Sequence, residues 1–241
     1  MLWRRLPGVF RSDIKFIARM PWLLTAILCP LIVILLHFLA SKHISVPGNA
    51  EKIYQYYTVT AVSLISAIPF VYGIVFSFIQ LNGSRLADTD ESIRHDSKKR
   101  DMFFMRLVIS GLSAFVVVLP VIYITDAVAT EGWLRSIYVS ILLAIEAPFI
   151  YTFSTGSGRS MLRWREWSLI SVLFILPVPF GLILHHPWNY LAFFSPFYWI
   201  SWAWIIPSPG ESLLYGLISF AITASVLFIL YVKFNKGKAT E

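Results

Sequence analysis

Two groups of residues in this sequence have the types needed for nucleophilic catalysis. Residues 155–159 read TGSGR, which places Ser157 among small residues as in a phosphate loop or a nucleophile turn, and His185 and His186 are of the type that activates a hydroxyl. However, the residue two positions before Ser157 is a threonine and not a glycine. The charge distribution described below also places the two histidines at the opposite membrane face from Ser157. A serine enzyme is therefore disfavoured, and we assign no catalytic residue.

The sequence also lacks patterns for binding metals or nucleotides. The histidines never fall at metal-ligand spacing with acids or cysteine: they are His37, His43, His95, His185 and His186. No Gly-x-x-x-x-Gly-Lys-Ser/Thr sequence supplies the backbone cradle and lysine that hold nucleotide phosphates. The single cysteine, Cys29, cannot form an intrachain disulfide. We expect no cofactor and no metal in this chain, so any ATP hydrolysis must come from another polypeptide.

Glu146 is the acidic residue that needs the most explanation. It lies near the middle of a predicted membrane span, two residues before Pro148, where an unpaired carboxylate is costly. One interpretation is a protonated or hydrogen-bonded structural glutamate at a helix kink. The other is a residue that faces a path through the membrane or the gate of that path. The sequence leaves both open.

The densest charged stretch lies between Arg85 and Asp101, flanked on both sides by apolar runs. Its charged residues are Arg85, Asp88, Asp90, Glu91, Arg94, Asp96, Lys98, Lys99, Arg100 and Asp101. A polar stretch between two membrane spans must sit in water. Mixed-sign charge at helical spacing further indicates a surface for another protein rather than for lipid.

The composition predicts an all-α, multi-pass membrane protein with a single domain over residues 1–241. Hydrophobic residues make up 57% of the chain and charged residues only 14%, and mean hydropathy is +0.70. A bilayer core requires about 20 apolar residues per helix. Six segments approach that length: 22–40, 58–81, 103–125, 134–154, 168–184 and 212–232. Pro177 and Pro179 predict a kink or unwinding in the fifth.

Basic residues in the short loops predict the orientation of these spans. Seventeen lysines and arginines fall on one side: five in the N-terminal segment, six around the second-to-third connection, three between spans four and five, and three in the tail. The other side has only Lys42, Lys52 and Arg135. Both termini should therefore face the cytoplasm. The net charge of +7 then follows from topology and an anionic leaflet, and no nucleic-acid partner is needed.

Two segments outside the spans have their own patterns. In residues 1–21, Leu6, Phe10, Ile14 and Ile17 recur at helical spacing between basic residues, which predicts an amphipathic helix on the cytoplasmic membrane surface. A disordered positive anchor is the alternative. Residues 185–211 are rich in aromatic residues and broken by prolines, which predicts short re-entrant helices at the outer interface. A simple aromatic belt is the alternative there.

This order of parts resembles the permeases of ABC transporters of the type-2 exporter class. The matching elements are Arg19-Met20-Pro21 with Pro30 at the first span, the charged run from Asp88 to Arg106, and Ser195-Pro196-Phe197-Tyr198-Trp199 before the last span. The resemblance covers the whole chain, but its motifs are short. The family often has Gly-Thr and a Pro after the acidic residue of its coupling segment. Residues 92–102 have neither, which leaves the docking register of that segment open.

The resemblance implies a small six-helix permease without its own ATPase, similar to exporters of drugs or antimicrobial peptides. It implies that a cytoplasmic ABC ATPase, two copies per complex, binds ATP and Mg and acts on a coupling segment within residues 82–102. The coupling residues would be Asp88, Asp90, Glu91, Arg94, Lys98, Lys99, Arg100 and Asp101. Glu146, Tyr198 and Trp199 would lie on the translocation path or its gate. A second permease copy or a sister permease would complete the path in a bacterial plasma membrane.

Two other functions remain open from the sequence. A secondary transporter would need several intramembrane polar residues for ion coupling, and Glu146 is the main candidate for such a residue. An intramembrane lipid-modifying or proteolytic enzyme would need a paired catalytic constellation, which the residues above do not provide. The sequence does not identify the substrate.

Overall fold

The computed structural model describes residues 6–43, 50–88, 96–125, 133–155, 161–183, 188–206 and 208–238, and all regular elements within them are helices. The helices are α1 (Leu6–Arg19), α2 (Pro21–His43), α3 (Ala50–Asp88), α4 (Asp96–Thr125), α5 (Trp133–Thr155), α6 (Met161–Ile175), α7 (Pro177–Ile183), the short 3-10 helix η3 (Trp188–Ala192), α8 (Pro196–Ile205) and α9 (Pro209–Lys238). The predicted all-α class is confirmed.

Five helical segments are long and apolar enough to cross a membrane. They are Val59–Asn82, Asp101–Tyr123, Trp133–Thr155, Leu162–Leu182 and Pro209–Ile229. A sixth is added if α1 and α2, which meet at 96°, are counted as one bent span. These segments overlap all six predicted ranges, and the fold is compatible with a multi-pass membrane protein. The predicted break in the fifth span is confirmed, because α6 ends at Ile175 and α7 begins at Pro177.

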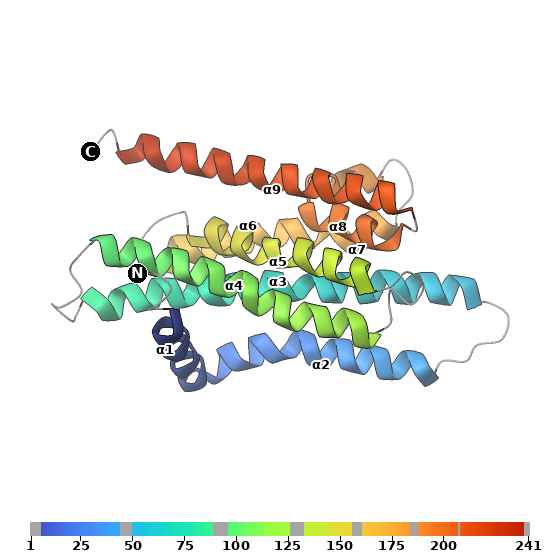
Figure 1. Cartoon of the computed structure of the whole chain (residues 1–241), viewed down its shortest axis with the longest axis horizontal. Coiled ribbons are helices and arrows are strands. Elements are labelled where there is room, and N and C mark those ends of the chain that lie inside the picture. The colour runs from blue at the N-terminus through green and yellow to red at the C-terminus, as the bar shows by residue number, and fades with distance from the viewer. Residues whose placement is uncertain are drawn as a thin grey trace.

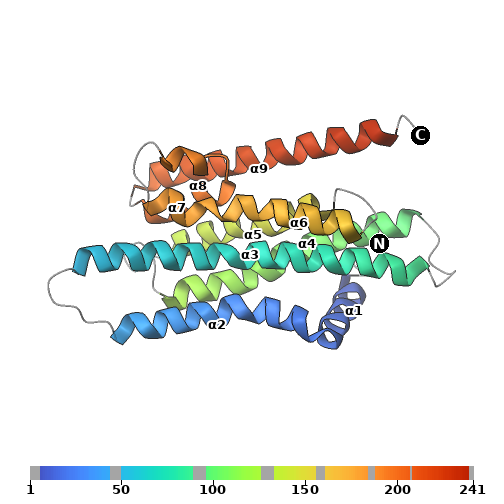
Figure 2. The same ribbon diagram turned by 180° about the vertical axis from the view of Figure 1, so that it is seen from behind.

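The long helices run side by side, with α2 at one edge of the bundle and α9 at the opposite edge (Figures 1 and 2). The centre is α5, which packs against both α3 and α4. Its buried residues include Leu143, Phe149 and Ile150, which join those of α3 in one hydrophobic core. Helix α9 packs mainly against α8, and it diverges from the bundle toward its C-terminal end (Figure 1). The bundle therefore has a dense centre and a loosely attached edge.

The contact between α3 and α5 depends on one glycine. A Cβ atom added at Gly73 would lie 2.7 Å from the carbonyl oxygen of Ala147 and 2.7 Å from the Cβ atom of Ile150. Because backbone atoms cannot move aside as the end of a flexible side chain can, a larger residue would push the two helices apart. Small residues allow this kind of close approach between helices in membranes.

Within the aromatic segment 185–211, the described helices η3 and α8 lie at one end of the bundle, beside α7 and the start of α9 (Figure 1). Helix α8 starts after Ser195, whose hydroxyl oxygen accepts a hydrogen bond from the backbone N–H of Tyr198, with Pro196 in the first turn. The Ser195 hydroxyl also donates to the carbonyl of Phe174 in α6. This capping residue therefore also attaches α8 to α6.

Helix α1 lies at the predicted position in the chain. Phe10 and Ile14 are 45% and 48% exposed, whereas Ile17 packs against the core. The inward side of α1 also carries the buried side chain of Asp13, whose partner is described below.

Candidate functional site

The charged segment between α3 and α4 lies partly outside the described residues. Asp90, Glu91 and Arg94 fall in that part of the chain. Asp88 is the last residue of α3, and residues 98–101 lie in the first turns of α4. The ends of α3 and α4 that flank the segment lie at the same end of the bundle as α1 (Figure 1).

A buried ion pair joins α1 to α4 near this segment. The Arg106 side chain donates from Nη2 to Oδ1 of Asp13 at 2.8 Å and from Nε to Oδ2 at 3.1 Å. Its Nη1 donates to Oε1 of Gln80 in α3, also at 2.8 Å. The side chains of Arg106 and Asp13 are only 6% and 2% exposed. We name Asp13, Gln80 and Arg106 the Arg106 node.

The geometry of the Arg106 node fits an arginine and not a lysine. The planar guanidinium bonds both oxygens of one carboxylate and still reaches an amide on a third helix, which a single ammonium point charge does less well. Tyr151 lies beside the pair, and its hydroxyl donates to the carbonyl of Phe103 at 3.2 Å. Helices α1, α3, α4 and α5 thus meet around one ion pair.

The sequence reasoning included Arg106 but missed Asp13. Arg106 ends the charged run that the sequence places before the third span. Asp13 lies among the basic residues of the N-terminal segment and was not predicted as a site residue. One signal was present: Asp13 is the sole acidic residue of α1 and is spaced four and seven residues from Val9 and Met20, which also turn inward. Its partner, however, lies 93 residues away, and local spacing does not identify such a pair.

Glu146 is almost fully buried, with 1% exposure, between α5 and α9. Its Oε1 accepts hydrogen bonds from the Thr223 hydroxyl at 2.9 Å and the Ser219 hydroxyl at 3.4 Å. Its Oε2 is buried without a hydrogen-bond partner among the described residues. We name Glu146, Ser219 and Thr223 the Glu146 node. It attaches α9 to the centre of the bundle.

The face of α9 that meets α5 consists of small and polar residues. Ser212, Gly216, Ser219 and Thr223 are all buried and recur at spacings of four, three and four. Gly216 lies directly against the ring and hydroxyl of Tyr138. The sequence singled out Glu146 but not its partners, because the spacing of small residues in α9 does not identify the helix they pack against, and Ser219 and Thr223 lie 73 and 77 residues from Glu146.

Tyr198 and Trp199 lie in α8 and do not join the Glu146 node. Tyr198 is 2% exposed and its ring stacks on Phe193, while Trp199 stacks on Tyr215 of α9 with ring centroids 5.6 Å apart. Burial away from water raises the pKa of the Tyr198 hydroxyl, so this group stays neutral at physiological pH. The predicted gate residues therefore form two separate groups, both of which contact α9.

A third polar cluster, which is partly buried, lies at the other end of the bundle. Nη2 of Arg135, at the start of α5, donates to the carbonyls of Trp204 at 2.7 Å, Ala203 at 3.3 Å and Ile206. The Ser212 hydroxyl of α9 donates to the Ala203 carbonyl at 2.6 Å, and the Tyr138 hydroxyl donates to the Ser212 carbonyl at 3.2 Å. We name Arg135, Tyr138 and Ser212 the Arg135 node. It caps the C-terminal end of α8.

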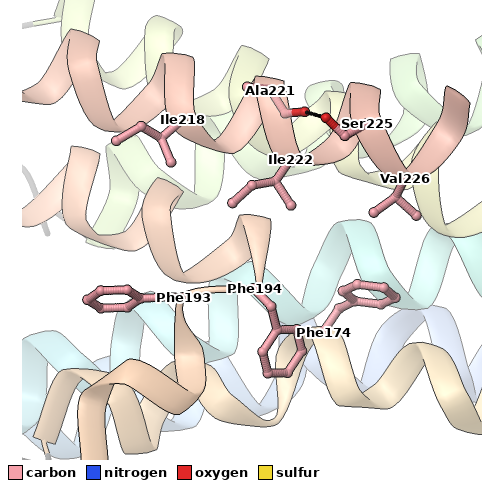
Figure 3. A pocket seen from close by; sticks show the side chains of 8 residues that line it. All are labelled: Phe174, Phe193, Phe194, Ile218, Ala221, Ile222, Ser225 and Val226. Carbon is pink, nitrogen blue, oxygen red and sulfur yellow. Dashed lines mark hydrogen bonds between the residues drawn. The ribbon is translucent and has the colours of Figure 1, made fainter. Parts of the chain in front are cut away.

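An open groove of about 460 Å³ runs between α6, the turn before α8, and α9. Figure 3 shows three rings across from an aliphatic face of α9. The lining residues are Phe174, Phe193, Phe194, Ile218, Ala221, Ile222, Ser225 and Val226. The one hydroxyl among them is satisfied, because Ser225 donates to the Ala221 carbonyl at 2.7 Å. The groove therefore presents hydrocarbon and no free polar group.

Within the described part of the chain, no cluster of three or more His, Cys, Asp or Glu residues has the arrangement of a metal site. Cys29 is exposed and is not in a disulfide. Ser157, His185 and His186, weighed above for nucleophilic chemistry, lie outside the described residues.

Among the described residues, the polar side chains that join different helices include these three nodes. Each node holds neighbouring helices together. No family model, curated protein or solved structure matches the chain.

Proposed function

We propose that this chain is the membrane-spanning permease subunit of an ATP-binding cassette exporter of the type-2 class. It moves a hydrophobic or amphipathic substrate out of the cytoplasm, and a separate cytoplasmic ATPase supplies the energy. The order of parts supports this reading: a helix that turns by 96° into α2, a charged connection between α3 and α4, and short helices before α9.

The Arg106 node is the observation that carries the proposal. Arg106 lies in α4, nearly three turns after its first residue Asp96, and its side chain bonds Asp13 of α1 and Gln80 of α3. A push on the charged segment would therefore reach α1, α3 and α4 together. This is the property needed where an ATPase must transmit a movement into a membrane domain.

The working complex has two permease subunits, identical or related, and two ATPase subunits that bind ATP and Mg. Both termini and the charged segment face the cytoplasm of a bacterial cell. When the ATPase pair closes, the charged segment moves α4, and the spans rearrange to release substrate outward. In this cycle α9 is the mobile wall, because its attachment to α5 rests on small and polar contacts that end at Thr223.

Secondary transport is the second candidate, and Glu146 is the observation that favours it. A buried carboxyl with two hydroxyl partners is a group that could take up and release a cation or a proton during transport. The two candidates differ in their energy source. Transport that runs in ATP-depleted vesicles on an ion gradient, without any ATPase partner, would favour the second.

A charge-reversal experiment tests the leading proposal. The chain is co-expressed with a candidate ABC ATPase, and complex yield and transport are measured for Asp90→Lys/Glu91→Lys. We expect membrane insertion to persist while complex formation, ATPase stimulation or transport falls, because the partner surface has lost its acidic charge. The matched control is Asp126→Lys/Glu131→Lys, with the same charge change in the connection predicted on the outer side. Normal complex yield and transport in the first variant would contradict the proposal.

A further inference from the structure

The groove between α6 and α9 lies within the two apolar segments that form its walls. Its α9 wall runs from Ile218 to Val226, inside Pro209–Ile229, and its α6 wall is Phe174, inside Leu162–Leu182. The α9 wall begins about 14 Å from the first residue of its segment and ends about 5 Å before the last residue. When these segments cross a bilayer, this depth holds hydrocarbon chains, because headgroups and water lie outside it.

Both walls of the groove are held in place by α5. On one side, the Phe174 ring packs edge-on against Phe149 of α5, with ring centroids 5.2 Å apart. On the other side, the Thr223 hydroxyl of α9 donates to Glu146 of α5 at 2.9 Å, and the preceding residue, Ile222, lines the groove (Figure 3). Because α5 sets the separation of α6 and α9, the groove stays open between them.

The lining of the groove favours an uncharged hydrocarbon. None of its eight lining residues is charged, and the one hydroxyl among them, on Ser225, already donates to the Ala221 carbonyl. A bound water needs about two to four polar partners, so water does not fill such a site. Rings and aliphatic side chains instead gain dispersion contacts from hydrocarbon placed against them.

The size and position of the groove fit a single flexible chain that enters from the bilayer. Over about 12 Å of α9, a helix about 10 Å across would need roughly twice the 460 Å³ that the groove offers. Leu217 and Leu173, the sequence neighbours of Ile218 and Phe174, are 66% and 55% exposed. The open groove is therefore continuous with the apolar outer surface of α6 and α9.

We infer that this groove binds one acyl chain of a membrane phospholipid. The chain lies between Phe194 and Ile222, and it adds a contact between α6 and α9. Such a contact matters for α9, because this helix otherwise packs mainly against α8 and α5. The inference goes beyond the exporter proposal, since it concerns a lipid that stays with the protein and requires no ATPase.

Photo-crosslinking with a labelled phospholipid tests the inference. The full chain is reconstituted without an ATPase into phosphatidylcholine vesicles that contain a small fraction of phosphatidylcholine with a diazirine in the middle of one acyl chain. After irradiation, mass spectrometry locates the lipid adducts. We expect more adducts at Phe194 and Ile222 than at Leu217, which is 66% exposed but lies outside the groove lining. A bound chain stays beside the groove residues longer than a passing chain stays beside Leu217.

Filling the groove should remove this preference. In Ile222→Trp, adducts at Phe194 should fall to the level seen at Leu217 in the unaltered chain. The matched control is Leu217→Trp, which makes the same change in side-chain volume outside the groove and should keep the adducts at Phe194. Ser225→Phe fills the groove from an exposed position of α9 and serves as a second variant. An unchanged size-exclusion profile verifies that each variant folds.

Three outcomes would overturn the inference. The first is an equal number of adducts at Phe194 and Leu217 in the unaltered chain. The second is an unchanged number at Phe194 in a folded groove-filling variant. The third is a disulfide-linked dimer of Ala221→Cys, in a Cys29→Ser background, with no lipid adducts in the groove, because a second copy of the chain would then occupy it. Loss of ATP-driven export would change none of these measurements, so the two proposals fail independently.

Discussion

The Arg106 node holds a buried arginine and the Arg135 node holds a half-buried one, and the two arginines stabilise different parts of the bundle. Arg106 meets a carboxylate and an amide, which are side chains of two other helices. Arg135 meets the backbone carbonyls at the end of α8. The first is a balanced ion pair that holds α1, an element brought from far along the chain. The second caps the C-terminus of a short helix and holds it in place. One end of the bundle is therefore held by an ion pair, and the other end is held by hydrogen bonds to the backbone carbonyls that end α8.

The two nodes should respond differently to the loss of their arginine. Removing Arg106 leaves the Asp13 carboxylate buried without its cation, and uncompensated buried charges are strongly unfavourable. Removing Arg135 leaves carbonyls, one of which still accepts from Ser212.

The largest effect is expected for Arg106→Met. We expect the free energy of unfolding to fall by about 3–5 kcal/mol, because Asp13 is left as an unpaired buried charge. Thermal unfolding in detergent measures this loss. Asp13→Asn/Arg106→Met should recover a large part of it, since the double variant has no buried charge at this position. If the double variant is as unstable as the single one, the ion pair is not what holds α1.

A smaller effect is expected for Arg135→Met. Carbonyls that lose a charged donor cost about 1–3 kcal/mol, and the loss should stay local to α8 and the start of α9. Hydrogen exchange should rise in residues 196–212 and stay unchanged in α1. Lys42 or Lys52 replaced by Met gives a charge-matched control on the same proposed side. Increased hydrogen exchange in α1 would contradict this prediction, because the two ends of the bundle would then not be stabilised independently.

Variants of Glu146 distinguish a gate residue from a structural one. The informative variant, Glu146→Gln, should change stability only a little. Glu146→Gln keeps the shape and the acceptor for Thr223, so we expect less than about 1 kcal/mol of change in stability but an altered transport rate. Glu146→Leu should lower stability, because the hydroxyls of Ser219 and Thr223 lose their acceptor. Ser219→Ala removes one of the two hydroxyls that donate to Glu146. Its matched control is Ser225→Ala, since Ser225 donates to the Ala221 carbonyl within α9. Normal transport in the Gln variant would make Glu146 structural.

Cysteine labelling tests which end of the helical bundle lies on which side of the membrane, and these substitutions should not change stability. Single cysteines at Ser97 and Ser208, in a Cys29→Ser background, should react with an impermeant maleimide from opposite sides. Ser97 lies in the first turn of α4 and Ser208 lies just before α9. Labelling of Ser97→Cys from outside in intact cells would reverse the topology.

Sequence reasoning predicted the features that depend on local pattern and missed those that depend on distant pairing. The lengths of the apolar segments located the spans, and Pro177 located the break between α6 and α7. Both features depend on residues that are close together in the sequence. The cost of a carboxylate in a span singled out Glu146. Its partner Thr223 lies 77 residues away and Asp13 lies 93 from Arg106, and such pairs form only when helices pack.

Local pattern also placed Phe10 and Ile14 on one side of α1, and the structure leaves both side chains exposed. The inward orientation of Asp13 was not predicted, because it depends on Arg106 in a distant helix.

The Arg106 node also has a consequence for biogenesis. Asp13 leaves the ribosome 93 residues before Arg106, so α1, α2 and α3 are all synthesised before the pair can form. During that interval the N-terminal segment carries an acid whose cationic partner has not yet been synthesised. Docking of α1 through this ion pair therefore has to follow synthesis of the first turns of α4.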